Sequence, residues 1–386
     1  MLELIAKIIV KSVVTPVLIG GYSRETRTKI NGITVDECLR LQSIKGLWRW
    51  WLRAYVAGAV REMNIADDKT FISNVRKVEK KLMGHAEAPS VASKFALKLR
   101  GTCNIGSMSL GEVKSYPRLR LMLLGKHIER LYYIESINNL SINVYERIFK
   151  GERLDSESKR LALISLYSAL LFNGIGKAGR RGFGCLEYEA EETEYEIKTE
   201  NLGHEDIRKI LNNGLECAMR ILRLKHSQTQ LLPPIPAISR ETLNVYYVDT
   251  SEHTPQNVLI DLQGFTVRTI RSKVLGEDPF RNRLQGWILG MTSIRGVKRK
   301  RQWHGYLASV NRRASPLFIS VHKKYALISI FKSRDWPNII RWRSGVKAEE
   351  KTLRINAEFL NQAYSTLATS LERYLERQGY SYRKVF

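Results

Sequence analysis

The chain has 386 residues, of which 44% are hydrophobic, and its 63 Lys and Arg residues outnumber 38 Asp and Glu residues, for a formal charge of +25. This length and composition predict a chain with a sizeable hydrophobic core, organised as two domains. No apolar run approaches the length of a membrane span, so a transmembrane protein is not expected. The large positive charge favours a polyanionic partner, either nucleic acid or an anionic membrane surface.

Cysteine usage and the N-terminus bear on the compartment. The four cysteines are scattered, without the paired spacing of a zinc site, at Cys38, Cys103, Cys185 and Cys217. This distribution fits a reducing interior. The N-terminal stretch alternates and continues into predicted structure without a small-residue cleavage site, so no signal peptide is expected. The sequence therefore predicts a cytoplasmic protein that holds no metal and no cofactor.

In chain order, the first half predicts a strand, a helix, further strands, a second helix and a strand. Residues 4–14 alternate and are β-branched, which predicts the first strand. The loop that follows contains Arg24 and Arg27 and leads into a tryptophan-rich helix. The later elements are expected as strands at 94–101, 118–125 and 141–148, a helix at 156–174 and an acidic strand after residue 184. This order is that of a βαββαβ domain.

The stretch SIKGLWRWWLRA (43–54) predicts a helix with Ser43 as its N-cap. Apolar residues recur at helical spacing and form one apolar arc that contains Trp48 and Trp51. These two tryptophans are therefore expected in the core, where replacement by Ala would cost several kcal/mol, roughly 3 to 5.

A basic stripe lies beside that arc, because Lys45, Arg49 and Arg53 recur every four residues. Trp50 lies off the apolar face, on the far side of this stripe. An indole flanked by guanidinium groups is expected to offer a stacking surface beside phosphate contacts, as single-stranded nucleic acid requires. The alternative is that Trp50 covers a neighbouring loop or domain. Membrane-surface binding is not favoured, since the core uses the apolar face of the helix.

The segment GIGKAGRRGFG contains five glycines and three basic residues, namely Gly174, Gly176, Gly179, Gly182, Gly184, Lys177, Arg180 and Arg181. Its GxGxxG spacing is not a dinucleotide site, because the segment follows a helix and precedes a strand, the reverse of the required order. Ala178 stands where a phosphate-binding P-loop needs Ser or Thr. The glycines are expected to let the backbone approach a ligand closely, with amides and solvated cations contacting phosphates.

The second half predicts another set of helices and strands. Expected elements are helices at 203–224, within 256–274 and at 355–378, a strand at 243–249, and a hairpin that turns at Lys323 and Lys324. We therefore predict an α+β protein of two ferredoxin-like (βαββαβ, RRM-like) domains with antiparallel sheets, spanning residues 1–195 and 196–386.

Charge is strongly uneven in the second half. Between Asp278 and Asp335 there are thirteen Lys and Arg residues and no acidic residue. A short charge run is usually a solvated face, but soluble surfaces normally intersperse charges of both signs. Trp303, Tyr306 and Phe318 interleave the stretch, as in a basic surface with stacking residues.

Several of these motifs together resemble the RAMP superfamily of CRISPR effector proteins: a strand ending in TP, a Gly-Gly loop, SIKGLWRWWLRA, and GIGKAGRRGFG before a strand. Within that superfamily, SIKG followed by RWW and RA most resembles the first subunit of type III-B Cmr effector complexes, and the chain length and NRRASPL (311–317) agree. The resemblance implies two ferredoxin-like domains, binding of CRISPR RNA toward its 3′ end with access to target RNA, and assembly with other Cmr subunits. It also implies that this subunit cleaves nothing itself.

The leading hypothesis is therefore an RNA-binding subunit without catalytic activity. The candidate RNA-binding residues are Arg24, Arg27, Lys45, Arg49, Trp50, Arg53, Lys177, Arg180, Arg181, Arg295, Lys298, Arg299, Arg301, Arg312 and Arg313. The chief alternative is a metal-independent RAMP endoribonuclease that processes CRISPR transcripts, whose chemistry would need a histidine placed near RNA. Of seven histidines only His304 lies in the basic stretch. A DNA-binding or membrane-surface protein would explain the charge but not the glycine segment.

Overall fold

The structure is a computed structural model of the chain. It describes residues 1–18, 27–30, 33–36, 38–63, 65, 67–122, 130–191, 196–223, 231–291, 305–308, 314–343 and 350–386. For 27–30, 33–36, 120–122 and Leu307 the backbone alone is described. Among the described residues, no helix is long and apolar enough to cross a membrane.

The N-terminal half is built on one antiparallel sheet in the order β4-β5-β1-β6-β7. Its strands are β1 (Leu2–Val13), β4 (Phe95–Ser109), β5 (Arg130–Arg147), β6 (Leu186–Glu191) and β7 (Ile197–Lys198). The main helices are α1 (Leu41–Arg61) and α5 (Ser156–Leu171), which give the βαββαβ order β1-α1-β4-β5-α5-β6. Shorter additions are the hairpin β2 (Arg27–Ile30) and β3 (Ile33–Asp36), and α2 (Asp68–Met83), α3 (Leu110–Ser115) and α4 (Pro117–Met122).

The C-terminal half repeats this plan with the sheet order β10-β11-β8-β14. Its strands are β8 (Leu243–Asp249), β10 (Leu317–Val321), β11 (Tyr325–Phe331) and β14 (Tyr382–Lys384). Its helices are α7 (Pro255–Phe265), α8 (Arg268–Leu275), α9 (Pro279–Asn282) and α10 (Ala357–Arg377), with the 3-10 turn η2 (Gly286–Leu289). An inserted three-stranded sheet contains β9 (Gly305–Ala308), β12 (Ile339–Arg343) and β13 (Lys351–Arg354). The predicted α+β fold of two ferredoxin-like domains is confirmed, since both sheets have the strand order 2-3-1-4 of that topology.

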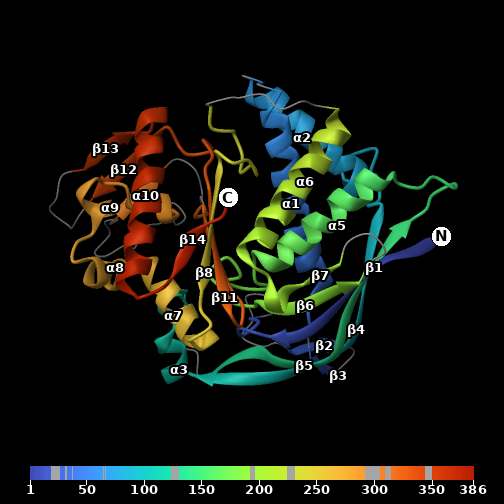
Figure 1. Ribbon diagram of the computed structural model, residues 1–386, viewed down its shortest axis with the longest axis horizontal. Helices are drawn as coiled ribbons and strands as arrows, with labels where there is room; N and C mark the ends of the chain where they lie inside the picture. The colour runs from blue at the N-terminus through green and yellow to red at the C-terminus, as the bar shows by residue number, and fades with distance from the viewer. Residues whose placement is uncertain are drawn as a thin grey trace.

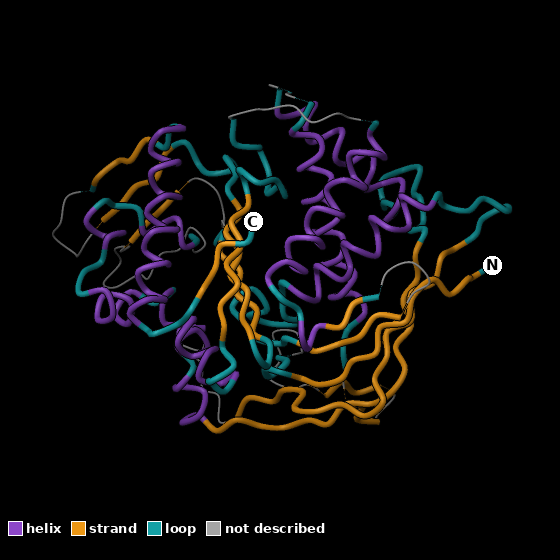
Figure 2. The backbone as a smooth tube through the Cα atoms, viewed as in Figure 1, coloured by secondary structure: helices purple, strands orange, loops and turns teal. Residues whose placement is uncertain are grey.

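The two halves are packed side by side and share a core. In Figure 1, β8, β11 and β14 lie between α10 on one side and α1, α5 and α6 (His204–Leu222) on the other, and Figure 2 shows the same helix–sheet–helix layering. Along β11, Leu327 and Phe331 belong to the core that includes α1, whereas Ile328 and Ile330 belong to the core under α10. This strand is therefore continuously hydrophobic, because both of its faces are buried.

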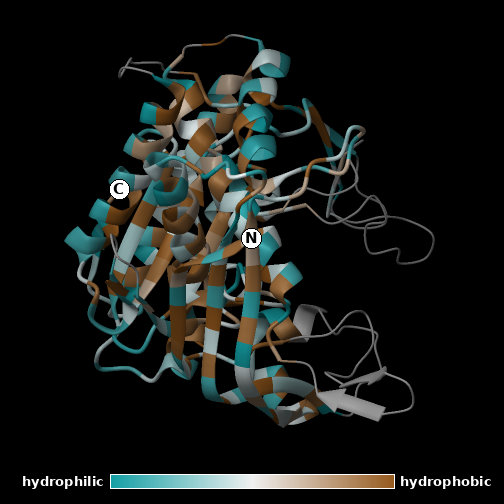
Figure 3. Ribbon diagram, turned by 90° about the vertical axis from the view of Figure 1, so that its right-hand side faces the viewer, coloured by the Kyte–Doolittle hydropathy of each residue, from teal (hydrophilic) through white to brown (hydrophobic). Residues whose placement is uncertain are grey.

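The N-terminal sheet is covered on one face only, and its sequence alternates accordingly. Ala6, Ile8 and Val10 of β1 are buried, and their neighbours along the strand are more exposed. Figure 3 shows this alternation of hydrophobic and hydrophilic residues along the long strands. The alternation is the period-2 pattern from which the first strand was predicted.

Three details differ from the sequence-based expectations. Helix α4 is found where a strand was predicted at residues 118–125, because Pro117 fits the first position of a helix. The helix expected within 256–274 is two helices, α7 and α8. Helix α6, which the prediction assigned to residues 196–386, packs against α1 and α5 of the N-terminal half. The domain boundary between residues 195 and 196 remains a proposal.

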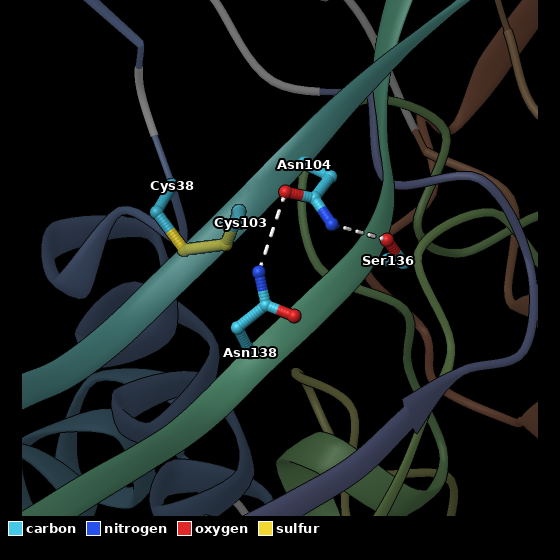
Figure 4. The surroundings of a disulfide bond; sticks show 5 residues. All are labelled: Cys38, Cys103, Asn104, Ser136 and Asn138. Carbon is cyan, nitrogen blue, oxygen red and sulfur yellow. Dashed lines mark hydrogen bonds between the residues drawn. A yellow bond between two sulfur atoms is a disulfide. The ribbon is translucent and has the colours of Figure 1, made fainter.

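Cys38 and Cys103 are joined by a disulfide across 65 residues. This bond contradicts the inference of a reducing interior that was drawn from the spacing of the cysteines. The bond ties the segment before α1 to β4 (Figure 4). Beside it, Asn104 donates a hydrogen bond to Ser136 on β5 over 2.9 Å, and Asn138 donates to Asn104 over 3.4 Å. Sequence spacing missed this pair because the two cysteines are 65 residues apart and come together only through the fold. Cys185 and Cys217 are buried thiols.

Candidate nucleic-acid interface

The tryptophan-rich segment is a helix, and its two predicted core tryptophans are confirmed as fully buried. Trp48 Nε1 donates to the carbonyl oxygen of Ala162 on α5 over 2.6 Å. Trp51 Nε1 donates to Asn173 Oδ1, also over 2.6 Å, and the Trp51 ring stacks on Phe172 with a centroid distance of 5.0 Å. Asn173 and Phe172 lead directly into the glycine segment. Trp51 therefore positions the start of that segment as well as filling the core.

The helix begins earlier than predicted. Its first residue is Leu41 and its N-cap is Arg40, so Ser43 lies inside the first turn and is not the cap. No side chain caps this end, and its first turn contains no acidic residue. The N-terminus of a helix carries a partial positive charge from its unpaired N–H groups, which favours a nearby anion.

The three residues of the basic stripe on α1 all contact neighbouring elements, and their predicted role in RNA binding stays a prediction. Helix α2 packs beside α1, and its nearly buried Glu79 lies 3.6 Å from Arg49 and 3.3 Å from Arg53. Arg49 also donates to the carbonyl oxygen of Met83 over 2.6 Å. Lys45 donates to the carbonyl oxygen of Phe95 over 3.3 Å, and burial lowers the pKa of its ammonium group. The stripe therefore holds α2 and β4 against α1.

Trp50 lies at the junction between the two halves, and its ring packs against aromatic side chains of the C-terminal half. Its ring centroid lies 5.0 Å from that of Phe318 on β10 and 5.0 Å from that of Phe331 on β11. Arg180 of the glycine segment covers the same cluster, with its guanidinium carbon 5.5 Å from the Trp50 ring and 4.7 Å from the Phe318 ring. The alternative stated from the sequence, that Trp50 covers a neighbouring domain, is the arrangement found.

The glycine segment is a compact loop between α5 and β6, and it needs its glycines for two reasons. Gly176, Gly182 and Gly184 have φ of +91°, +84° and +73°, in the region that side chains rarely adopt. A Cβ at Gly174 would lie 1.6 Å from the carbonyl oxygen of Phe183, and one at Gly179 would lie 2.1 Å from that of Gly174. The loop thus crosses itself where only glycine fits.

Much of the loop's hydrogen bonding is internal, which limits the amide donors predicted for phosphate. Its backbone amides at Gly174, Ile175, Lys177, Arg181, Gly182 and Gly184 all donate to carbonyl oxygens of the loop or of the segment after β1. These bonds fix the shape of the loop and leave its side chains to line the adjacent space.

Arg181 is not a solvated loop residue, contrary to expectation. Its two terminal nitrogens donate to the carbonyl oxygens of Leu317 and Leu289 over 3.4 Å each. Burial lowers the pKa of its guanidinium group well below the usual value, and the nearby charges of Arg118 and Arg180 lower it further. Arg181 therefore joins the loop to the C-terminal half at the cost of placing three like charges close together.

Two adjoining cavities run along this loop, and we call them together the loop groove. The first, of about 370 Å³, lies at the N-terminus of α1 and is lined by Leu18, Arg40, Ser43, Gly46, Leu47, Ile175, Gly176 and Lys177. The second, of about 460 Å³, is lined by Leu47, Arg118, Asn173, Gly174, Gly176, Ala178, Gly179, Arg180, Arg181, Ala314 and Ser315. Leu47 and Gly176 belong to both cavities.

The lining of the loop groove is strongly basic. Among the described residues, no acidic residue lines either cavity, and five of the lining residues carry positive charge: Arg40, Arg118, Lys177, Arg180 and Arg181. Sequence reasoning identified the last three but missed Arg40 and Arg118. If the predicted helix had started at residue 41, Arg40 would have been recognised at its N-terminus, the positive end of the helix dipole. Arg118 was hidden because its segment was interpreted as a strand.

Other predicted residues lie elsewhere. Arg27 is in β2, where only the backbone is described, and seven candidates fall outside the described residues: Arg24, Arg295, Lys298, Arg299, Arg301, Arg312 and Arg313. His304 also lies outside them. Within the described ranges, no histidine lines the loop groove, and no three His, Cys, Asp or Glu side chains are grouped as metal ligands.

Comparison with known proteins agrees with this architecture. Residues 12–187 match the model of the RAMP superfamily. No curated protein matches the sequence. The crystal structure of Cmr1 from Pyrococcus furiosus in its apo form is similar over 100% of this chain and 99% of that one, at 19% identity and a TM-score of 0.56.

A chain in the cryo-EM structure of the type III-B Cmr-beta complex bound to cognate target RNA is similar over 96% of this chain and 100% of that one. The identity is 14% and the TM-score 0.58. At these identities the likeness concerns the fold. The resemblance to the RAMP superfamily expected from the motifs is thus confirmed over residues 12–187, and the chain as a whole shares the fold of Cmr1.

Proposed function

We propose that this protein is an RNA-binding subunit of a type III-B CRISPR effector complex and that its loop groove binds the RNA backbone. One observation carries the proposal. The guanidinium group of Arg181 is close to the charges of Arg118 and Arg180, in a cavity whose described lining contains no acidic residue. Like charges held together raise the free energy of the folded state, and a bound anion lowers it. A phosphodiester chain supplies such charges at regular spacing.

The chemistry of the groove fits a strand recognised without regard to sequence. The contacts available are guanidinium groups, one ammonium group and the uncapped end of α1, all of which suit phosphate. In line with the family resemblance, we propose that the strand is CRISPR RNA toward its 3′ end, with target RNA nearby. The Cmr-beta structure with the same fold contains target RNA, which supports this assignment. Other Cmr subunits are the proposed protein partners.

We also propose that the protein binds RNA without cleaving it. Among the described histidines, His322 is fully buried and is held by the carbonyl oxygen of Leu171 over 3.0 Å, far from any role as a general base. Incubation of the purified protein with CRISPR transcript in EDTA tests this part. Intact transcript is the expected result, and discrete products would establish the endoribonuclease alternative.

The cytoplasmic location stays part of the proposal, but the disulfide removes the cysteine argument for it.

Gly46 offers a direct test of the groove. It lies on α1, lines the first cavity, and a Cβ there would meet no atom within 4 Å. Either Glu or Gln replaces glycine in a helix without loss of helix propensity. Gly46→Glu adds a negative charge where phosphate is proposed to bind, and Gly46→Gln adds the same bulk without charge.

In titrations with single-stranded RNA, we expect Gly46→Glu to bind about five- to thirty-fold more weakly than Gly46→Gln, from about 1–2 kcal/mol of charge repulsion. Thermal melting of both variants checks that the fold is intact. Equal affinities for the two variants would exclude the loop groove as the RNA site.

A further inference from the structure

A third cavity lies in the C-terminal half, where the inserted sheet covers α8 and α9. Its volume is about 450 Å³, a size that suits one small ligand. It shares Arg118 with the loop groove and is otherwise lined by a different set of residues, among them Arg268, Arg281, Tyr306 and Trp342. We call it the C-terminal cavity.

Two aromatic side chains form one wall of this cavity. Trp342 on β12 and Tyr306 on β9 are directly paired across the two antiparallel strands, so their side chains lie on the same face of the sheet. The backbone N–H of Gly286 donates to the Tyr306 hydroxyl over 3.1 Å, and burial raises the pKa of that hydroxyl to about 12. Tyr306 is therefore fixed and neutral, and half-buried Trp342 lies beside it.

Positive charge exceeds negative charge in the lining. Asp278 is the only acidic residue in the described part of the lining, and it pairs with the buried Arg271 over 2.9 Å. Arg271 also donates to the carbonyl oxygen of Phe265. Arg268 lies 4.0 Å from the second oxygen of Asp278 and is largely exposed. The side chain of Arg281 makes no hydrogen bond or ion pair with any described residue and is exposed.

Arg118 is the link between this cavity and the loop groove. Desolvation lowers the pKa of its guanidinium group, and that group has no ion-pair partner among the residues described. A partly buried cation without a counter-charge favours an anion on the side that remains open. Arg118 lines both cavities, so one phosphate bound to its guanidinium group would be adjacent to both.

We propose that the C-terminal cavity binds a nucleoside phosphate, with the base against Trp342 and Tyr306 and the phosphate at Arg118, Arg268 or Arg281. An aromatic pair on a sheet face beside cations is the arrangement by which proteins hold an unpaired base. The nucleotide is either a free molecule or an unpaired residue of a bound strand. The proposal that this nucleotide continues into a strand in the loop groove rests on the proposed function. The recognition of a base and a phosphate in the C-terminal cavity does not.

Photocrosslinking of the wild-type protein tests the site without any substitution. A single-stranded oligonucleotide that contains 5-iodouridine reacts with aromatic side chains that touch the base. We expect adducts on Trp342 or Tyr306 when the crosslinked protein is digested and its peptides are identified by mass spectrometry. Adducts confined to residues outside the C-terminal cavity would overturn the proposal.

Substitution at Trp342 gives the energetic test. We expect Trp342→Leu to weaken binding of single-stranded oligouridylate by about five-fold to about a hundred-fold, the range for loss of one stacked base. Trp342→Phe keeps a ring and is expected to stay within about three-fold of wild type. Thermal melting checks folding, and the crosslinking result decides if Trp342→Leu does not fold. Wild-type affinity in a folded Trp342→Leu protein would overturn the proposal.

A charge-matched pair separates the site from general attraction by a basic protein. Arg281→Gln should weaken binding several-fold and reduce the salt slope of log K by about 0.7. Lys273→Gln makes the same change in net charge on α8, at an exposed residue that does not line the cavity, and should have little effect. Equal losses in both variants would overturn the assignment of phosphate to this cavity.

Competition by uridine monophosphate identifies the source of the nucleotide. Displacement of the crosslinked oligonucleotide by the mononucleotide supports a site for a free nucleotide, and displacement by longer RNA alone supports a strand. Displacement by a phosphopeptide but by neither nucleotide would overturn the proposal. If Gly46→Glu and Gly46→Gln bind RNA equally while Trp342→Leu loses affinity, the loop groove is excluded as the RNA site and the C-terminal cavity is supported. If Gly46→Glu binds more weakly than Gly46→Gln while a folded Trp342→Leu protein binds as wild type, only the C-terminal cavity is rejected.

Discussion

Two clusters of basic residues on neighbouring elements of the N-terminal half have opposite relations to negative charge. On α1, Arg49 and Arg53 share the carboxylate of Glu79 and remain partly exposed. In the loop groove, Arg181 is close to Arg180 and to a third arginine, and the described lining contains no acidic residue. The first cluster holds helices together. The second gathers positive charge along a cavity.

A run of basic residues in a sequence does not by itself identify a ligand-binding surface, because a segment that packs on it can supply the counter-charge. Glu79 follows Arg53 by 26 residues, and α2 brings it back across the stripe. Among the described residues, no acidic side chain lines the loop groove in this way. Instead the C-terminal half contributes carbonyl oxygens of Leu289 and Leu317, which hold Arg181 without neutralising it. If the two clusters differ in this way, substitutions in them should have different effects on stability and on RNA binding.

The largest expected effect is on the support of the loop groove. Trp51→Ala removes a fully buried indole together with its hydrogen bond to Asn173, which lines the groove. We expect a loss of about 3–5 kcal/mol in the free energy of unfolding, measured by chemical denaturation. RNA affinity should also fall, because the loop loses its anchor. A variant that melts normally would show that the core and the loop are not coupled in this way.

A second test concerns His322, which lies between β10 and the C-terminal end of α5. Burial lowers its pKa to about 4, despite a hydrogen bond to Leu171 and the nearby charge of Glu187, which both raise it. Because the folded pKa is below the unfolded value of about 6.5, the contribution of His322 to the free energy of unfolding is complete above pH 6.5. It is lost as the pH falls toward 4, by about 3 kcal/mol.

The matched variant is His322→Gln, which can still donate to the Leu171 carbonyl but does not titrate in this range. Denaturation curves between pH 7 and pH 4 should show a steeper loss of stability for wild type than for His322→Gln. Parallel curves for the two proteins would contradict the buried neutral histidine.

Trp50→Ala tests whether that ring joins the two halves or binds RNA. The ring packs on Phe318 and Phe331, so we expect a stability loss of about 2 kcal/mol, less than at Trp51 because Trp50 is half-buried. A double-mutant cycle with Phe331→Leu should give a coupling of about 1 kcal/mol. RNA affinity of the folded variant should be close to that of wild type. Stable Trp50→Ala protein with lost RNA affinity would restore the stacking hypothesis.

The smallest effect on stability is expected at Glu79. Glu79→Gln removes the counter-charge of Arg49 and Arg53, both of which remain partly exposed, so the loss should be about 1 kcal/mol. RNA affinity should change less than three-fold. A large gain in RNA affinity would mean that Glu79 merely masks a phosphate-binding stripe.

The sequence predicted the elements that depend on local pattern and missed those that depend on distant partners. Helical periodicity placed Trp48 and Trp51 correctly in the core, and glycine spacing identified the loop. The role of Trp50 could not be predicted, because its neighbours Phe318 and Phe331 come from strands more than 260 residues away. Arg118 was missed for a related reason. The apolar pattern around it favoured a strand, whereas Pro117 starts a short helix there.

The salt dependence of RNA binding in two charge-matched variants tests the central claim most directly. Lys177→Gln removes a charge from the loop groove, and Arg53→Gln removes one from the stripe on α1. With single-stranded RNA over a range of salt concentrations, the slope of log K against log salt should fall in magnitude by about 0.7 for Lys177→Gln and stay at the wild-type value for Arg53→Gln. A reduced slope for Arg53→Gln with an unchanged slope for Lys177→Gln would contradict the account.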